Sequence, residues 1–306
     1  MPPKSIIKER ISLDEIFLGV TLLASLVLLF IFFNLFYQLL YHSLSTLLKF
    51  GLKFFVETRW DPSKNIYSAL PFIFGTFYTA TLALIISFFL SLGTAIFLTE
   101  LAPPNLRELF AAIVDLIAAI PSVVIGLWGI FYLAPFVRES IHPILSRLSF
   151  IPLFQGETTG LSYLTAILVL TFMISPIMTS FFKSALESVP DDLKDALYAL
   201  GATRYEVIKN VSIPYTKTAL LAGVILAYGR ALGETMAVTM VIGNQPIITL
   251  SLFSPGYTLS SVIANEFLEA TNRLYVSSLI TLGLTLFIIS FIVNLIGMLV
   301  IRRWSE

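Results

Sequence analysis

Long apolar runs alternate with short polar segments along the whole chain. Six of these runs are longer than the roughly 18–20 residues that a helix needs to cross the hydrocarbon of a bilayer. The predicted spans are 16–41, 70–98, 106–133, 161–182, 218–242 and 274–301. The first run is too long for the core of a signal peptide, and no small-residue cleavage site follows it. The pattern predicts an all-α membrane protein with one domain of six transmembrane helices over residues 16–301.

Composition and charge narrow the class further. Of the 306 residues, 57% are hydrophobic and 12% are charged, and the mean hydropathy is +0.90. A soluble domain carries about 25% charged residues. The formal net charge is zero, so no general attraction to nucleic acid is expected. The chain has no cysteine, which excludes a disulfide framework, a zinc–cysteine cluster and a thiol nucleophile.

Lysine and arginine in the polar segments predict the orientation. With the N-terminus inside, 11 of the 19 Lys and Arg residues fall in inner segments and 7 in outer segments, while Arg230 lies within a span. Cytoplasmic loops of membrane proteins carry the excess of positive charge. The terminal segments 1–15 and 302–306 are therefore both predicted to be cytoplasmic.

The outer segment 42–69 is predicted to contain a helix that lies in the membrane interface. Its apolar residues recur at helical spacing, at Leu44, Leu47, Leu48, Leu52 and Phe55. The two histidines, His42 and His142, fall in different outer segments with no cluster of ligands beside them. No metal site is predicted.

The segment 184–217 faces the cytoplasm and is longer than a connection between neighbouring helices requires. Its helix signals are two capping boxes, a glycine and a proline, namely Ser188 with Asp191, Thr203 with Glu206, Gly201 and Pro214. They predict two short helices, the first ended by Gly201 and the second closed by Pro214. A rigid cytoplasmic projection of this kind suits docking to another protein.

Part of this segment, "DALYALGATRYEVIKNVSIP", resembles the coupling loop of ATP-binding-cassette importer permeases. That loop begins Glu-Ala-Ala, has a glycine four residues after the second alanine, and ends in the pattern apolar-x-apolar-Pro. The residues that carry the resemblance are Asp195, Ala196, Gly201, Ala202, Val211, Ile213 and Pro214. Asp195 replaces Glu and Leu197 replaces the second Ala. The resemblance implies that these residues couple the chain to an ATPase.

Three further segments are similar to the phosphate-specific branch of that family, in its PstC-like form. They are "WDPSKNIYSALPFIFGT" (60–76), "AAIPSVVIGLWG" (118–129) and "GRALGETMAVTMVIGN" (229–244). The resemblance implies the type I importer-permease architecture and a multi-pass subunit of the plasma (inner) membrane. It also implies three kinds of partner: a second, PstA-like permease, two cytoplasmic ATPase subunits that use ATP and Mg, and an external phosphate-binding protein.

The chain lacks the residues for chemistry of its own. It has no Gly-rich loop of the kind that cradles nucleotide phosphates, and no Ser-His-Asp or Cys-His set. We therefore expect a transport subunit that is not an enzyme and binds no cofactor, with ATP hydrolysed by a partner.

Arg230 and Glu234 are two charges inside the fifth predicted span. Residues four apart lie on one face of a helix, about 6 Å apart along its axis. Gly229 and Gly233 beside them would let a neighbouring helix or an ion approach the backbone, and Thr235 adds a hydroxyl. One interpretation is a buried structural ion pair. The other is a pathway lining in which Arg230 meets an anion and Glu234 moderates the attraction.

Weaker signals and alternatives concern the other polar positions. Pro121 should break the third span, where Ser122 would satisfy a freed backbone group. The break would either line the pathway or bend the helix.

The predicted function is passage of inorganic phosphate. The alternatives are another oxyanion, such as sulfate or molybdate, and an ion-coupled transporter with Asp115 and Glu234 as proton relays.

Overall fold

The structure is a computed structural model that describes residues 13–305, so residues 1–12 and 306 of the predicted terminal segments lie outside the described residues. Over this part of the chain the fold is helical, with one isolated β-bridge between Asp61 and Ile66 and no strand. Six helical stretches are long and apolar enough to cross a membrane, as the sequence predicts. The all-α class is confirmed.

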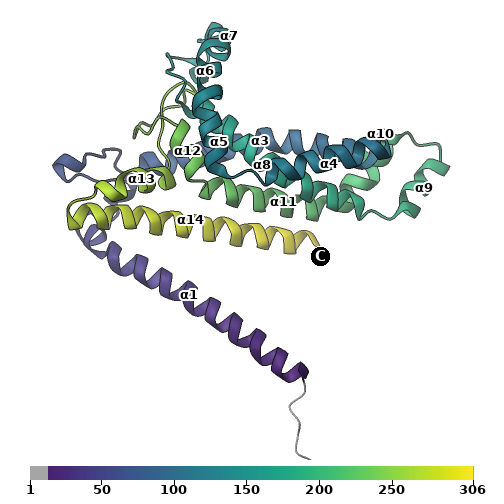
Figure 1. The fold of residues 1–306 in the computed structure, drawn as a ribbon, viewed down its shortest axis with the longest axis horizontal. Helices are drawn as coiled ribbons and strands as arrows, with labels where there is room; N and C mark the ends of the chain where they lie inside the picture. The colour runs from purple at the N-terminus through teal and green to yellow at the C-terminus, as the bar shows by residue number, and fades with distance from the viewer. Residues whose placement is uncertain (1–12, 306) are drawn as a thin grey trace, which may run out of the picture.

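Four long helices lie side by side in the main bundle (Figure 1), namely α3 (Leu70–Ile96), α8 (Tyr163–Glu187), α11 (Ile213–Gly233) and α14 (Arg273–Ser305). In the most apolar window of α8, 67% of the residues are buried, against 28% or fewer in each of the other five spans. The helix at the centre of the bundle is therefore α8. Its Pro176 stays within one continuous helix.

The first span, α1 (Leu13–Phe50), is longer than predicted and diverges from the bundle along its N-terminal half (Figure 1). Residues 42–50 continue this helix, so the separate interfacial helix predicted there is wrong. No proline or glycine interrupts residues 20–50, and Gly51 follows the end of the helix with φ +53°. The end of α1 packs on α14, where the Thr46 hydroxyl donates to Ser277 Oγ at 2.9 Å. Only the short α2 (Lys53–Val56) and η1 (Pro62–Lys64) follow before α3.

The third predicted span, 106–133, is wrong as a single helix. The α4 helix (Pro104–Ala118) ends before Pro121, and α5 (Ser122–Trp128) starts a new direction in Figure 1. Proline disfavours a helical residue before it and has no N–H to donate, so the predicted break at Pro121 is confirmed. No side-chain hydrogen bond caps α5, so the expected role of Ser122 at this break is not observed. The new helix continues to Leu148 through η3 (Gly129–Leu133), α6 (Ala134–Phe136), η4 (Val137–Ile141), α7 (His142–Leu145) and η5 (Ser146–Leu148).

The fifth predicted span, 218–242, is also interrupted. The α11 helix ends at Gly233, and α12 (Met236–Val241) resumes two residues later. An extended loop then leads to α13 (Leu259–Glu266) and η8 (Phe267–Glu269) before α14 begins. This loop packs on the start of α8, where the backbone N–H of Tyr163 donates to Ser254 O at 3.0 Å and that of Leu164 to Leu252 O at 2.8 Å.

The loop also lies against α3 at Gly75, because a β-carbon there would collide with the backbone carbonyl of Tyr257. We expect Gly75→Ala to lower the unfolding temperature of the detergent-solubilised chain, since overpacking in a buried contact costs about 1–3 kcal/mol. Gly93→Ala is the matched control on the same helix, because no atom lies within 4 Å of a β-carbon at that position. Equal unfolding temperatures for the two variants would contradict this contact.

Candidate functional site

The candidate site centres on the break between α11 and α12. Glu234 leaves the helix with φ −67° and ψ 126°, which is extended backbone. A break inside a span frees backbone polar groups that need partners. Two hydroxyls supply them: Ser260 Oγ of α13 donates to Glu234 O at 2.7 Å, and Thr235 Oγ1 donates to Gly233 O at 3.2 Å. These two hydroxyl groups, including that of Thr235, thus stabilise the break between α11 and α12.

Arg230 and Glu234 do not form the helical pair that the sequence predicts. The spacing rule requires a helix through both residues, and the helix ends between them at Gly233. The Glu234 carboxylate turns instead toward α12, where its Oε1 accepts from the Ala237 N–H at 3.5 Å. None of the ion pairs among the described residues includes Arg230 or Glu234. Among the described residues the structure therefore shows no Arg230–Glu234 ion pair of the kind that the structural interpretation requires.

Arg230 lies on an exposed face of α11. Leu226, which is 48% exposed, precedes it by one turn, and the exposed Gly233 follows it by three residues. Tyr228, two residues before Arg230, lies on nearly the opposite side of α11, where its hydroxyl is 3.0 Å from that of Thr81 on α3. A guanidinium on an open face can bind an oxyanion, because it keeps its charge and presents several N–H donors.

The two glycines next to Arg230 differ in what they contact. A β-carbon at Gly229 would lie 3.2 Å from Asn294 Oδ1, so this glycine allows α11 to pack on α14. No atom lies within 4 Å of a β-carbon at Gly233, which leaves open space beside the helix break. The structure supports a packing role for Gly229 and an open surface at Gly233.

The break at Pro121 is connected to the α11–α12 break through the packing of α5 on α12. A β-carbon at Gly126 would lie 3.0 Å from the Ala237 Cα, so the two helices touch at backbone distance. No hydrogen bond or ion pair among the described residues joins Ser122 to Arg230. Pro121 is exposed and Ser122 half-buried, and their part in a pathway stays a prediction.

Asp115 lies apart from this site. It sits on α4 and accepts a hydrogen bond from Ser180 Oγ of α8 at 3.2 Å, beside a cavity of about 150 Å³ that Lys183 also lines. No contact among the described residues connects it with Glu234. The structure gives no relay between these two carboxylates. Among the described residues, no group of three His, Cys, Asp or Glu side chains could hold a metal ion.

The predicted cytoplasmic projection contains α9 (Asp191–Ala199), a turn and α10 (Arg204–Val207), at one end of the bundle (Figure 1). The turn contains Gly201 at φ +85°, which confirms the predicted left-handed glycine. The second capping box is also confirmed, since the Thr203 N–H donates to Glu206 Oε2 at 2.7 Å and the Glu206 N–H donates to Thr203 Oγ1 at 3.4 Å.

The first predicted capping box is wrong. Ser188 caps the end of α8 instead, and its hydroxyl donates to Ala185 O at 2.7 Å. Pro190, in extended conformation, takes the N-cap position of α9. Because Pro190 follows Ser188 by two residues, Ser188 cannot start a helix that runs through both.

Pro214 does not close a short second helix, which corrects the other boundary of the projection. The chain stays helical from α10 through the π-helical turn η7 (Ile208–Ser212) into α11, and Pro214 stands in the first turn of α11. The first turn of a helix tolerates proline, and a π turn before it absorbs the missing hydrogen bond. The projection therefore continues directly into the span that carries Arg230.

The surface of the projection is open to a partner. Every residue of α9 is exposed except Lys194 and Leu197, which are half-buried. The coupling residues Asp195 and Ala196 lie on the exposed part, and Leu200 at the tip is 86% exposed. Ala202, Val211 and Ile213 are half-buried.

Comparison with known proteins agrees with this geometry. A family model described as "Binding-protein-dependent transport system inner membrane component" matches residues 91–306. The phosphate transport system permease protein PstC of Mesorhizobium japonicum is 43% identical over 295 residues, which cover 95% of this chain and 90% of that protein. The probable phosphate transport system permease protein PstC of Methanocaldococcus jannaschii is 41% identical and covers 97% of this chain and 93% of its own length.

Two solved structures share the fold. A bacterial ABC transporter involved in the import of the acidic polysaccharide alginate matches with a TM-score of 0.62 and 15% identity, over 96% of this chain and 97% of that chain. The inward-facing MetNI methionine ABC transporter matches with a TM-score of 0.59 and 18% identity, over 81% of this chain and 100% of that chain. At these identities the likeness concerns the fold alone.

Proposed function

Since the chain belongs to the family of binding-protein-dependent transport system inner membrane components, and its relatives include PstC permeases, we propose that it passes inorganic phosphate from an external binding protein into the cytoplasm. It is a permease subunit with the fold of type I ABC importers. The predicted family and architecture are confirmed. The relatives favour this function over an ion-coupled transporter, and the separation of Asp115 from Glu234 agrees.

The observation that carries the proposal is the unpaired Arg230 on the open face of α11, one turn before a helix break. Phosphate at neutral pH carries at least one negative charge, and a guanidinium binds two of its oxygens with parallel N–H donors. The neighbouring carboxylate of Glu234 weakens the hold on the anion, which a conduit needs if the ion is to leave again. We propose Arg230, Glu234, Thr235 and Gly233 as pathway residues, with Pro121 and Ser122 at the second break.

The partners follow from the same family. We propose a second, PstA-like permease, two ATPase subunits that bind ATP and Mg, and an external phosphate-binding protein. The exposed α9–α10 projection is the part of this chain that would dock on an ATPase. This chain itself would hydrolyse no ATP and bind no cofactor.

We propose that both termini and the α9–α10 projection lie in the cytoplasm of a cell with this subunit in its inner membrane. Because the chain has no cysteine, single introduced cysteines report their side without background. Cysteines at Lys64 and Gln155 should react with an impermeant thiol reagent added to intact cells, and a cysteine at Leu200 only after permeabilisation. All three positions are exposed, whereas Lys194 is too buried to serve as a probe. The reverse labelling pattern would refute the orientation.

The function is tested by reconstitution. Liposomes with the whole complex, the binding protein outside and ATP inside should accumulate labelled phosphate. Labelled sulfate and molybdate form the comparison arms. Uptake of either at the rate of phosphate would assign the site to oxyanions in general. Uptake that needs a proton gradient and no ATP would overturn the importer proposal.

A further inference from the structure

One ion pair ties the α9–α10 projection to the membrane bundle. Lys194 Nζ of α9 lies 2.7 Å from Glu100 Oε1, in the π-helical turn η2 (Phe97–Leu101) that ends α3. The two side chains are 15% and 9% exposed. Of the five ion pairs found among the described residues, the other four join residues at most four apart in sequence. This pair joins residues that are 94 apart.

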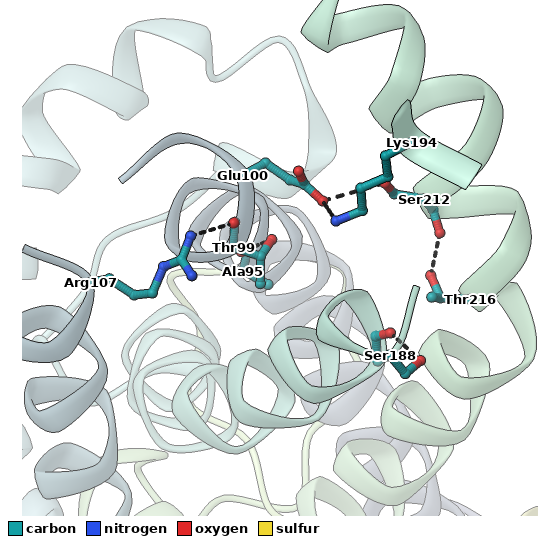
Figure 2. Close-up of polar contacts among 9 residues, drawn as sticks. Ala95, Thr99, Glu100, Arg107, Ser188, Lys194, Ser212 and Thr216 are labelled. Carbon is teal, nitrogen blue, oxygen red and sulfur yellow. Dashed lines mark hydrogen bonds and ion pairs between the residues drawn. The ribbon is translucent and has the colours of Figure 1, made fainter. Parts of the chain in front are cut away.

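The same carboxylate also reaches the helix that carries the candidate site. Ser212 Oγ, in the π-helical turn before α11, donates to Glu100 Oε1 at 3.4 Å, and the residue is fully buried. Figure 2 shows the side chains of Lys194 and Ser212 both reaching the Glu100 carboxylate from the same side. One oxygen therefore connects the end of α3, the projecting α9 and the start of α11.

The end of α3 is fixed from its other side as well. Arg107 of α4 donates to the backbone carbonyl of Thr99 at 2.7 Å, as Figure 2 shows. A π-helical turn leaves backbone carbonyls without their usual partners, and such turns occur often at functional sites. With Arg107 holding the neighbouring residue, a pull on Glu100 moves the helix end as a unit instead of unwinding it.

The two faces of α9 differ in exposure. Its exposed face carries Asp195, and its half-buried face consists of Lys194 and Leu197. Because no residue of α9 is fully buried, little else fixes this helix to the bundle. A force applied to the exposed face has a direct path to the end of α3 through the Lys194 ammonium, beside the continuous helix that leads from α10 into α11.

We propose that Glu100 and Lys194 form a clamp that transmits movement of the α9–α10 projection to α3 and α11 during transport, so that Lys194 is a positioning residue for coupling. The clamp rests on the proposed function, since it needs an ATPase docked on α9. It touches neither the anion nor ATP. Its loss should therefore separate ATP hydrolysis from transport while leaving both partners bound.

The test uses the whole complex with its ATPase and binding protein in liposomes. The measured quantity is the phosphate transported per ATP hydrolysed. Lys194→Met removes the charge and keeps the length of the side chain, and it should lower this ratio about tenfold, within the usual range for coupling between two sites. Co-purification of the ATPase should not change. Lys183→Met is the control, because it breaks a short-range pair with Glu187.

A charge swap separates a clamp from a general defect. Glu100→Lys/Lys194→Glu restores opposite charges with positions exchanged, and Lys194→Arg keeps the charge in place. Both should recover the ratio to within about twofold, since the pair acts as a unit. If Lys194→Met keeps the original ratio, or if it loses the ATPase subunit, the clamp is refuted. If the unaltered complex moves no phosphate, the proposed function fails instead. If every variant, Lys194→Arg included, fails to insert, the pair is structural and the clamp is also refuted.

Discussion

Arg230→Leu should assemble with its partner subunits and yet lower phosphate uptake by about 10- to 150-fold, the effect of losing one charge-assisted hydrogen bond of about 1.5–3 kcal/mol. The side chain is exposed and has no ion-pair partner among the described residues, so its removal leaves no buried charge behind. Leucine is compatible with the apolar face around Leu226. The measurement is uptake of labelled phosphate at equal amounts of assembled complex.

Two further variants sharpen this prediction. Arg230→Lys should also be impaired, because an ammonium is a point charge that cannot bind two oxygens with a planar fork. Arg230→Leu/Glu234→Leu should not recover, since the two residues form no ion pair that a double change could neutralise. Recovery of transport in the double variant would return the pair to a structural role. Arg138→Leu is the control, because Arg138 lies on the α5–α7 helix and pairs with its neighbour Glu139.

The sequence predicted the class of the protein and most of its spans because apolar length is a strong signal for a membrane helix. The apolar pattern did not predict the helix boundaries around the two interrupted spans. At Pro121 the break itself was predicted, but the length of the following helix was not. That helix continues past Arg138, whose charge is compensated by the adjacent Glu139 at 2.7 Å. A rule that ends spans at charged residues cannot detect such compensation.

The arrangement of Arg230 and Glu234 could not be predicted from their spacing. Four residues share a face only if the helix continues, and here the backbone turns at Glu234. The turn is stabilised by Ser260 of α13, which donates to the Glu234 carbonyl from 26 residues away. A tertiary contact of this kind overrides local helix preference and leaves no periodic trace in the sequence.

The two capping boxes show how local rules succeed and fail. Thr203 and Glu206 bond reciprocally as the pattern predicts, because nothing between them opposes a helix. Ser188 and Asp191 have the same spacing, but Pro190 between them forces an extended residue and moves the helix start.

The Glu100–Lys194 pair could not be predicted from the sequence for a different reason. Its members are 94 residues apart in the sequence, and only the tertiary fold brings them together.

Gly201→Val should reduce ATPase recruitment and phosphate uptake by about tenfold or more while the membrane spans stay folded. Gly201 has φ +85°, a conformation that costs a β-branched residue about 1–3 kcal/mol. No atom lies within 4 Å of a β-carbon at this position, so the cost is conformational and falls on the turn between α9 and α10. The altered turn would reorient the exposed Asp195 relative to the ATPase.

The open space around Gly201 provides a matched control. Asparagine tolerates the left-handed region better than other residues with a β-carbon, and nothing nearby would collide with it. Gly201→Asn should therefore retain most of the recruitment and uptake. An equal loss in both variants would mean that the partner contacts the glycine surface itself, and no loss in either would refute docking through this turn.

Charge reversal at Asp195 tests the same surface without straining the backbone. Asp195 is exposed and on the part of α9 that faces away from the bundle, so Asp195→Lys should fold normally. It should weaken ATPase binding, because a reversed charge at an interface places like charges together and costs several kcal/mol. Asp195→Glu keeps the charge and supplies the residue of the family motif, so it should bind as the unaltered chain does. The readout is the amount of ATPase that co-purifies with the permease as salt is raised. If Asp195→Lys binds the ATPase fully, Asp195 does not contribute to the docking surface. The docking would then depend on the apolar tip around Leu200.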